Sequence, residues 1–453
     1  MLRRLLYDCA LVPLALGLAW SLAAFNPRLR ANLLARRGVA QRLAQAAQRR
    51  DAHRPLAWFH VASAGEYLQV EPLLRRFRAR GCQLAVTLTS VSGLRWLQRM
   101  ADWPELVYAH MAPFDRRGDV RALLDALQPD VLVLAQADLW PNLVLETRAR
   151  GVPQVLVAAR IGAGATYRLR RPLRGLYRAL YGGLDAIAAL TPGDRERLAL
   201  LAPRHPRLSV AGDPGIETVL ARMREARDAP VTAALEARWP RRDAPRLIAG
   251  SIWPQDEAHL LPLLREALQH WPSFTVLLVP HEPHEAHLRA LEAALAPLAV
   301  ARLSHLEAPA ADGAAAAAAA TPAPRVVLVD GIGRLAGLYV LASVAYVGGG
   351  FSTGVHNVAE PAAAGLPVLF GPRHGKSPVA QALCAAGGGF PVGDGPTLRA
   401  ALWPLLADKA AARIAGERAR AVVTGMAGAV ERCEALILEV APGLAGPDGA
   451  EPR

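Results

Sequence analysis

The sequence predicts an α/β protein with two doubly wound, Rossmann-like domains, preceded by an apolar N-terminal helix. Three observations lead to this prediction. The chain of 453 residues is too long for a single hydrophobic core. Short apolar segments alternate with helical ones, which is typical of parallel strands joined by helices. Polar or glycine-rich turns follow many of the strands, at the edge where such sheets bind ligands.

The composition narrows the class of partner. The net charge is +13, almost entirely from arginine, which predicts an anionic partner such as a membrane surface, a phosphorylated lipid or a nucleic acid, unless it only reflects a GC-rich genome. No basic run is interleaved with aromatic residues, which disfavours nucleic acid. The four cysteines have no CxxC spacing, which argues against a zinc site or a disulfide framework and suits a reducing compartment.

Residues 5–25 are nearly all apolar and just long enough to span a bilayer, with Asp8 as the only charge. No clear small-residue cleavage site follows, so a retained anchor is favoured over a cleaved signal. More arginines follow the segment than precede it, which predicts a cytoplasmic location for the rest of the chain. Three arrangements remain open: a membrane span, a helix lying in one leaflet, and a core helix.

The next part of the chain is expected to form the first sheet. Its predicted strands are Trp58–Ala62, Leu84–Leu88, Glu105–Ala109, Val131–Leu134, Val155–Ala158, Ala186–Leu190 and Leu208–Ala211. Glu66, Asp138 and Arg160 each follow one of these strands. Ligands of doubly wound sheets bind beyond the carboxyl ends of the strands, so these three side chains are candidate site residues.

A charged, helical stretch over residues 216–245 marks the expected domain junction. The predicted strands after it are Leu247–Ala249, Thr275–Val279, Val326–Val329, Val344–Val347 and Leu366–Phe370. Residues 307–324, rich in alanine and proline, are predicted to be a loop insertion. Beyond Phe390 the chain is predicted to be mostly helical, from Thr397 to Val440, before a polar tail.

The stretch from Ala345 to Pro372 carries the most chemical information. Gly348–Gly350 follow an apolar strand, and His356, Asn357 and Glu360 come next, with Glu360 at the head of an alanine-rich helix. Backbone N–H groups at such a strand end and helix N-terminus suit a phosphate or carboxylate, and Glu360 can accept hydrogen bonds from sugar hydroxyls. The alternative is that the glycines only turn the chain and that Glu360 is a first-turn dipole residue.

This order of elements fits the two-domain glycosyltransferase architecture called GT-B, but also periplasmic binding proteins and epimerases. Six motifs occur in the order and spacing of the lipid A Kdo transferases, which are 3-deoxy-D-manno-octulosonic acid transferases. They are HVASAGE (60–66), ADLWPN (137–142), AGSIWPQDE (249–257), VPHE (279–282), DGIGRLAGLY (330–339) and GGGFSTGVHNVAEPAAAGLPVLFGP (348–372). The chain resembles that family from about Leu5 to Val440.

The resemblance implies an inverting GT-B enzyme that needs neither metal nor cofactor. Such an enzyme transfers Kdo from CMP-Kdo to a lipid A precursor (lipid IVA) in lipopolysaccharide core assembly, at the cytoplasmic face of the bacterial inner membrane. The implied partners are the donor, the lipid acceptor and the membrane surface, and no nucleic acid. The implied organisation is a membrane anchor over 1–27, an acceptor-binding domain over 28–215, a CMP-Kdo-binding domain over 216–400, and helices with a tail over 401–453.

The resemblance also assigns site residues. Glu66 is the implied general base, and the helix dipole at its position favours the ionised form that a base needs. Glu66 is also spaced as the capping-box partner of Ser63, and the two roles are compatible. Residues implied to bind the acceptor or the donor sugar are Ser63, Gly65, Asp138 and Arg160. Residues implied to bind CMP are Ser251, Ile252, His281, Glu282, Gly333, Arg334, His356, Asn357 and Glu360.

Some alternatives stay open. Arg334 can be a surface residue and His281 a capped core histidine, while Trp140 fits the core better than a ligand site. The chain departs from the family pattern at Gln136, which replaces an acid, and near Gly162 and Pro214. Two other functions therefore remain: a GT-B transferase for a different nucleotide sugar or acceptor, and a non-catalytic membrane protein that binds an anionic lipid.

Overall fold

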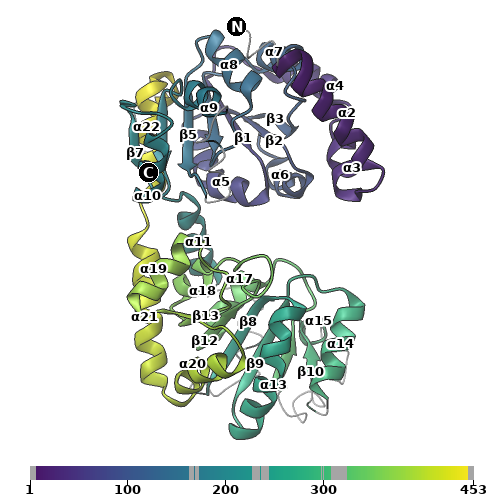
Figure 1. The fold of residues 1–453 in the computed structure, drawn as a ribbon, viewed down its shortest axis with the longest axis vertical. Helices are drawn as coiled ribbons and strands as arrows, with labels where there is room; N and C mark the ends of the chain where they lie inside the picture. The colour runs from purple at the N-terminus through teal and green to yellow at the C-terminus, as the bar shows by residue number, and fades with distance from the viewer. Residues whose placement is uncertain are drawn as a thin grey trace. The chain divides into compact units, whose positions relative to one another are not determined.

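The computed structural model describes residues 7–162, 168, 173–226, 235, 244–296, 298, 300–307 and 324–446. The chain divides into two compact units (Figure 1). The first unit contains residues 1–218 and 427–453, and the second contains residues 219–426. Most of the predicted junction after residue 226, residues 308–323 of the predicted insertion and the tail from residue 447 lie outside the described residues.

The first unit is built on a seven-stranded parallel sheet in the order β3-β2-β1-β4-β5-β6-β7. The strands are β1 (Leu56–Val61), β2 (Gln83–Leu88), β3 (Leu106–Met111), β4 (Val131–Ala135), β5 (Gln154–Ala159), β6 (Ala186–Ala189) and β7 (Leu208–Val210). The strand order changes direction between β1 and β4. In doubly wound sheets this is the point where ligands bind.

Helices cover both faces of this sheet, because side chains alternate along each strand. Ala57, Phe59 and Val61 of β1 share one core with α5 and α22, and Leu56 and Trp58 share the opposite core with α4, α7 and α8. The helices of this unit are α2 (Val12–Ala23), α3 (Pro27–Leu34), α4 (Val39–Arg49), α5 (Ala64–Ala79), α6 (Leu94–Leu97), α7 (Arg117–Leu127), α8 (Pro141–Ala149), α9 (Arg174–Tyr181), α10 (Pro192–Ala199) and α22 (Ala429–Val440), with α11 (Gly215–Ala226) crossing the boundary between the units.

The apolar N-terminal segment forms a π-helical turn over Tyr7–Leu11 followed by α2. The helix ends before Asn26, whose side chain accepts a hydrogen bond from the Leu29 N–H and caps α3, with Pro27 as the first residue of that helix. Among the described residues, none of the helices has the length and apolar character needed to cross a bilayer.

Polar side chains fasten the start of this segment to the rest of the unit. Tyr7 donates a hydrogen bond to Asp115 at 2.7 Å, and Asn142 donates one to Asp8 at 2.6 Å. Asp115 also accepts from the N–H groups of Asn142 and Leu143 at the start of α8. Asp8, the single charge in the apolar run, therefore has a fixed partner within the domain.

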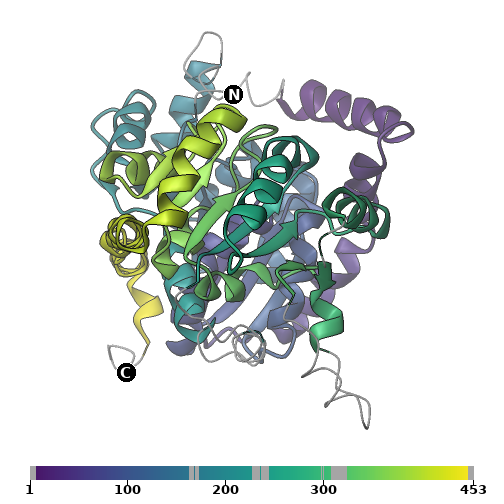
Figure 2. The same cartoon turned by 90° about the horizontal axis from the view of Figure 1, so that it is seen from below.

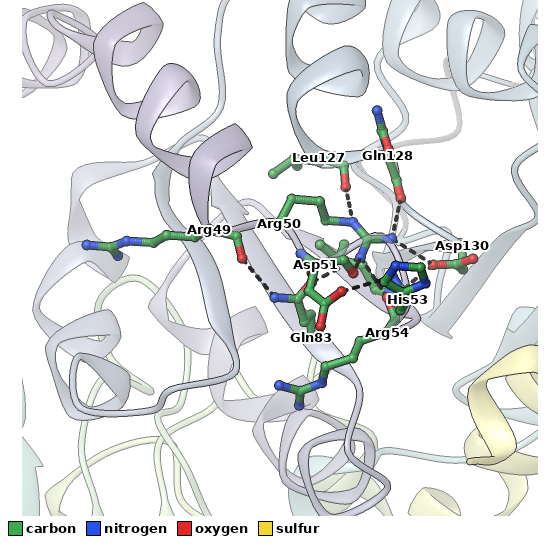
Figure 3. Close-up of polar contacts among 10 residues, drawn as sticks. Arg49, Arg50, Asp51, His53, Arg54, Gln83, Leu127, Gln128 and Asp130 are labelled. Atoms are coloured by element: carbon green, nitrogen blue, oxygen red, sulfur yellow. Dashed lines mark hydrogen bonds and ion pairs between the residues drawn. The ribbon is translucent and has the colours of Figure 1, made fainter. Parts of the chain in front are cut away.

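A second polar cluster holds the end of α4 against the amino-terminal ends of the strands (Figure 3). Arg50 donates to the carbonyl oxygens of Leu127 and Gln128 at 2.9 and 3.1 Å, and to the side chain of Gln83 at 3.0 Å. Asp130 lies 3.4 Å from Arg50 and also accepts from the N–H of Leu56 at 2.7 Å. The cluster and the Tyr7–Asp115 contact fix the N-terminal helices at two separate places.

The second unit repeats the architecture, with a seven-stranded parallel sheet in the order β10-β11-β9-β8-β12-β13-β14. Its strands are β8 (Arg246–Ile252), β9 (Thr275–Pro280), β10 (Val300–Arg302), β11 (Val326–Leu328), β12 (Val344–Val347), β13 (Val368–Phe370) and β14 (Gly389–Pro391). The strand order changes direction between β8 and β12, next to the glycine-rich stretch. The two doubly wound α/β domains predicted from the sequence are confirmed.

Helices lie on both faces of this second sheet as well (Figures 1 and 2). They are α13 (Pro254–His270), α14 (Glu285–Leu295), α15 (Leu303–Glu307), α17 (Leu335–Leu338), α18 (Ala359–Ala364), α19 (Pro378–Ala386), α20 (Gly395–Ala407) and α21 (Lys409–Gly425). The C-terminal helical section divides between the units. Helices α20 and α21 belong to the second unit, whereas α22 packs against the sheet of the first through Val430, Cys433 and Ile437.

The three glycines after β12 are required by close backbone packing. A Cβ on Gly348 would collide with the Ser251 carbonyl oxygen and lie 2.7 Å from Cα of Ile252, and a Cβ on Gly350 would lie 2.5 Å from Cα of Gly371. Gly349 has φ of +89°, a conformation that favours glycine. The turn therefore brings the ends of β8, β12 and β13 closer than other residues allow.

We predict that Gly348→Ala lowers the free energy of unfolding by about 1–3 kcal/mol, because the neighbouring atoms are backbone and cannot move aside alone. Gly375→Ala is the matched control, since a Cβ there meets nothing within 4 Å. Denaturant unfolding of both variants measures the effect. Equal stability of the two variants would contradict the packing argument.

Candidate functional site

Glu66 and Asp138 lie at the carboxyl edge of the first sheet, on either side of the change in strand order. Glu66 is in the first turn of α5, directly after β1, and Asp138 follows β4. Ser63 caps α5 and accepts from the Glu66 N–H at 3.5 Å, while the Glu66 carboxylate accepts from the Ala62 N–H at 2.5 Å. Gly65 is an exposed residue in the same turn. Glu66 therefore takes part in the helix start and still presents a carboxyl group to the ligand edge.

The two carboxyl groups have opposite pKa shifts. Burial raises the pKa of Glu66 to about 7, and the charge of Asp138 also raises it. The hydrogen bond from the Ala62 N–H and the charge of His60 lower this pKa, but by less. Burial alone would also raise the pKa of Asp138, but His60, Trp140 and Thr89 outweigh it and the pKa is lowered. Near neutral pH Asp138 is ionised, whereas Glu66 titrates. Such divergent pairs identify acid and base roles.

Two neighbours of these carboxyl groups were not singled out from the sequence. The side chain of His60 is almost fully buried, with Nδ1 2.8 Å from Thr87 Oγ1 and Nε2 3.6 Å from Asp138 Oδ2. Thr89 donates to Asp138 at 3.3 Å. His60 belongs to the HVASAGE motif and precedes the turn, so its position at a strand end was a usable signal.

Arg36 is a third residue that the sequence did not single out. It donates to the Thr89 carbonyl oxygen at 3.0 Å and lies over the ring of Phe114 at 5.2 Å. Burial lowers the pKa of Arg36, and the nearby charge of Asp138 opposes this. Nothing in the local sequence distinguishes Arg36 from the other arginines around it.

Arg160 belongs to a neighbouring group of residues, at the ends of β4, β5 and β7. Its charge acts on Asp213, whose pKa is raised by burial. Gln136 donates to Gln69 at 2.6 Å, and Gln69 donates to Asp213 at 3.0 Å. Gln136, the amide that replaces an acid of the family pattern, therefore completes a chain of side-chain hydrogen bonds. It has φ of +54°, a strained conformation of the kind found beside functional sites.

Three rings gather at the corresponding edge of the second sheet. The Trp253 ring stacks on His281 at 4.6 Å between centroids, and His281 stacks on His356 at 4.4 Å. Trp253 Nε1 donates to His356 Nε2 at 2.8 Å. Burial and the neighbouring His281 lower the pKa of His356 to about 4, so His356 is neutral at physiological pH and can accept this hydrogen bond.

Asp256 organises the loops at this edge. It is fully buried and accepts from Tyr346 O–H and from the N–H groups of Gly349 and Trp253, each at 2.9 Å. Two N–H groups of the kind that we expected to be free for an anion are therefore bound to a carboxylate. Ser251 has φ of +52°, and Ile252 contributes its carbonyl oxygen to the His281 N–H at 2.9 Å.

Glu360 and Asn357 lie together beside α18. Asn357 accepts from the Ala359 N–H at 3.0 Å. Burial raises the pKa of Glu360, and Arg222 of α11, 3.9 Å away, opposes the shift together with Asn357. Arg222 was not singled out from the sequence, because it lies more than a hundred residues from Glu360.

The remaining predicted residues lie on exposed turns. Gly333, with φ of +84°, and Arg334 are exposed, and Arg334 pairs with Glu307 at 3.2 Å. Glu282 is half-exposed and lies 3.4 Å from His284. Among the described residues, no three His, Cys, Asp or Glu side chains gather as a metal site would require.

Helix α2 exposes a row of large apolar side chains. Leu14, Leu18 and Leu22 recur every four residues and are 71%, 57% and 50% exposed, and Phe25 continues the row at 89%. An exposed apolar surface of this kind is typical of contact with a membrane or another protein.

Comparison with known proteins shows similarity to one family of transferases. Residues 36–216 match the family model of the 3-deoxy-D-manno-octulosonic-acid transferases (kdotransferases). A 3-deoxy-D-manno-octulosonic acid transferase of Bordetella pertussis is 29% identical, over 83% of this chain and 86% of the relative. One from Chlamydophila psittaci is 28% identical, over 74% of each chain.

Solved structures agree with the fold. A glycosyltransferase from Rickettsia africae has a TM-score of 0.54 at 12% identity, over 87% of this chain and all of the other. A UDP-GlcNAc 2-epimerase from Neisseria meningitidis has a TM-score of 0.60 at 13% identity, over 85% of this chain and all of the other. The first sheet and its carboxylate pair lie within the residues that the family model covers. The chain is therefore similar over most of its length to 3-deoxy-D-manno-octulosonic acid transferases, which are glycosyltransferases.

Proposed function

We propose that the protein transfers Kdo from CMP-Kdo to a lipid A precursor (lipid IVA), with inversion at the anomeric carbon and with Glu66 as the general base. The observation that carries this proposal is the divergent pair of carboxyl groups at the ligand edge of the first sheet. A base of pKa about 7 is matched to proton transfer near neutral pH. The family supplies the donor and acceptor classes.

In this mechanism the acceptor hydroxyl approaches the Glu66 carboxylate. Its oxygen forms a bond to the anomeric carbon of Kdo while the bond from that carbon to the CMP phosphate oxygen breaks. The hydroxyl proton passes to Glu66, and CMP leaves with the bonding electron pair. Burial keeps the pKa of Glu66 raised, and the ionised Asp138 adds to this effect, while His60 and Thr89 hold Asp138 in place.

The second unit is the proposed site for CMP-Kdo. The rings of Trp253, His281 and His356 offer flat surfaces on which a base can stack. Glu360 and Asn357 supply hydrogen-bond acceptors for sugar hydroxyls. The other residues of the proposed donor site are Ser251, Ile252, Glu282, Gly333 and Arg334. The proposed sugar-binding residues of the first unit are Ser63, Gly65, Asp138 and Arg160.

We further propose that α2 holds the protein on the cytoplasmic face of the inner membrane by lying in the interface. The exposed row of Leu14, Leu18 and Leu22 is the apolar contact. Arg28 and Arg30 of α3 are exposed directly after it and suit anionic headgroups. The protein would then bind its lipid acceptor at the surface of the membrane that contains this lipid.

Glu66→Gln is expected to lower the rate of Kdo transfer by about 10²–10⁴-fold, because the amide cannot accept the proton. CMP binding should be unchanged, since Glu66 lies in the first unit. Glu105→Gln, which changes a carboxylate paired with Arg78, is the control and should retain activity. Radiolabelled Kdo transfer and calorimetric CMP titration measure the two properties. Full activity of Glu66→Gln, or preferential binding of UDP over CMP, would contradict the proposal.

The pH dependence of transfer should report the titration of Glu66. The base is active when ionised, so kcat/KM should fall as the pH drops below about 7. The charge of Asp138 raises the pKa of Glu66, so Asp138→Asn should move this fall to lower pH. Asp125→Asn, at an exposed carboxylate, should leave the profile in place. If the pH at which kcat/KM falls is unchanged or higher in Asp138→Asn, the proposed effect of Asp138 on the pKa of Glu66 would be contradicted.

Replacing both Leu14 and Leu18 with Asp should weaken partition into vesicles that contain anionic lipids by about tenfold or more. Each change removes apolar surface that the membrane would bury. Leu200→Asp, at an apolar residue that is 49% exposed and far along the chain from α2, is the control. Sedimentation with vesicles measures the partition. Unchanged binding of the double variant would show that α2 is not the membrane contact.

A further inference from the structure

We propose that a cavity beneath α2 binds an acyl chain of the acceptor lipid, so that α2 forms one wall of the acceptor site. This inference rests on the proposed function and extends it, because it assigns the apolar part of the acceptor to named residues. It gives the N-terminal helix a second role beside contact with the membrane.

The cavity has a volume of about 630 Å³ and lies within the first unit. This volume is within the usual range for small-molecule sites, about 300–1,000 Å³. On the helix side it is lined by Val12, Ala15, Leu16 and Ala19. On the side of the domain its apolar lining includes Phe114. An apolar cavity of this kind suits a hydrocarbon chain.

Part of the lining of the same cavity is polar. His60, Thr89 and Arg36 contribute to it. His60 and Thr89 are the residues that contact Asp138, and Asp138 acts on Glu66. One continuous cavity therefore extends from the helix to the two residues that contact Asp138. An amphiphile fits this arrangement, with its sugar hydroxyl near Glu66 and a chain along α2.

Charge favours the acceptor lipid over an uncharged amphiphile or an apolar peptide. The Arg36 guanidinium is held by the carbonyl oxygens of Asn32 and Thr89, at 2.8 and 3.0 Å, and lies within reach of the charge of Asp138. A cation in the lining of a mainly apolar cavity complements an acidic headgroup, and Asp115 in the same lining is engaged by Tyr7 and by the N–H groups at the start of α8. The lipid of the proposed reaction combines such a headgroup with acyl chains.

The two faces of α2 separate the two roles. The lining residues occupy positions 12, 15, 16 and 19, at the spacing of one helix face. The exposed row at Leu14, Leu18 and Leu22 occupies a different face. The contacts of Tyr7 with Asp115 and of Asn142 with Asp8 hold the start of the segment on the domain, so the helix is fixed as a wall of the cavity.

The test fills the cavity without changing the outer face. Ala19→Trp places a large side chain at a lining position, and Leu200→Trp places the same side chain at an exposed position far along the chain from α2 as the control. Each variant is assayed with CMP-Kdo in detergent micelles. One acceptor is the tetra-acylated lipid A precursor, and the other is the same precursor after removal of its acyl chains. Thermal unfolding confirms that both variants are folded.

Ala19→Trp should lower kcat/KM for the acylated acceptor by about tenfold or more, because burial of several methylene groups is lost. It should leave kcat/KM for the deacylated acceptor within about twofold of the wild type. Leu200→Trp should keep both values. Unchanged use of the acylated acceptor by Ala19→Trp, or an equal loss with both acceptors, would overturn the inference.

A second measurement does not depend on transfer. A fatty acid with a photoreactive group on its chain is irradiated with the wild-type protein, and labelled peptides are mapped by mass spectrometry. Label is expected on the peptides that contain Ala19 and Phe114, and Ala19→Trp should abolish it. Absence of label at both positions would overturn the inference even if the protein transfers Kdo. Label at both with no transfer in any variant would instead refute the proposed function.

Discussion

The burial of two neighbouring carboxyl groups, those of Glu66 and Asp138, is the constraint on which the candidate site depends. Both groups occupy the same edge of the first sheet because β1 and β4 are neighbours, and burial disfavours two negative charges there. The charge on Asp138 is stabilised by His60, Thr89 and Trp140, so its pKa is lowered. Glu66 is therefore the carboxyl group whose pKa is raised. A single structural arrangement therefore gives one permanent anion and one group that exchanges a proton near neutral pH.

The N-terminal segment is bound to this site more closely than an independent anchor would be. Asp8 and Tyr7 are held by Asn142 and Asp115, and Asn142 belongs to the ADLWPN motif that also carries Asp138. The motif therefore serves two purposes, because one of its residues faces the site and another fixes the N-terminal segment. Arg36 connects the same region to the site through the Thr89 carbonyl oxygen.

Much of the fold was predictable because the strands are short, apolar and followed by turns. β1 and β4 were predicted to within two residues at each end, since every position in them is buried. β10 and β14 were not predicted, because three residues with a partly exposed pattern carry little periodic signal. The predicted membrane-length segment ended earlier than expected, at a helix boundary set by Asn26 and Pro27.

The candidate site was predictable only in part. Glu66, Asp138 and His356 were recognisable because each follows a strand end within a motif. Asp256 was not singled out from the sequence, because two of its three donors, Tyr346 and the Gly349 N–H, come from a distant part of the chain. Arg36 and Arg222 were not singled out for the same reason. Arg36 contacts Thr89 and Arg222 contacts Glu360, and both partners lie far away in sequence. The pKa of Glu66 also differed from expectation, since burial outweighed the helix dipole that was expected to favour ionisation.

The most direct measurement is mass spectrometry of the lipid after incubation of the purified protein with CMP-Kdo and the tetra-acylated lipid A precursor. The account predicts a product heavier by the mass of one or two Kdo residues, with release of an equal amount of CMP. An unchanged lipid, under conditions in which the protein binds CMP, would contradict the assignment of the acceptor. An unchanged lipid without CMP binding would contradict the assignment of the reaction itself.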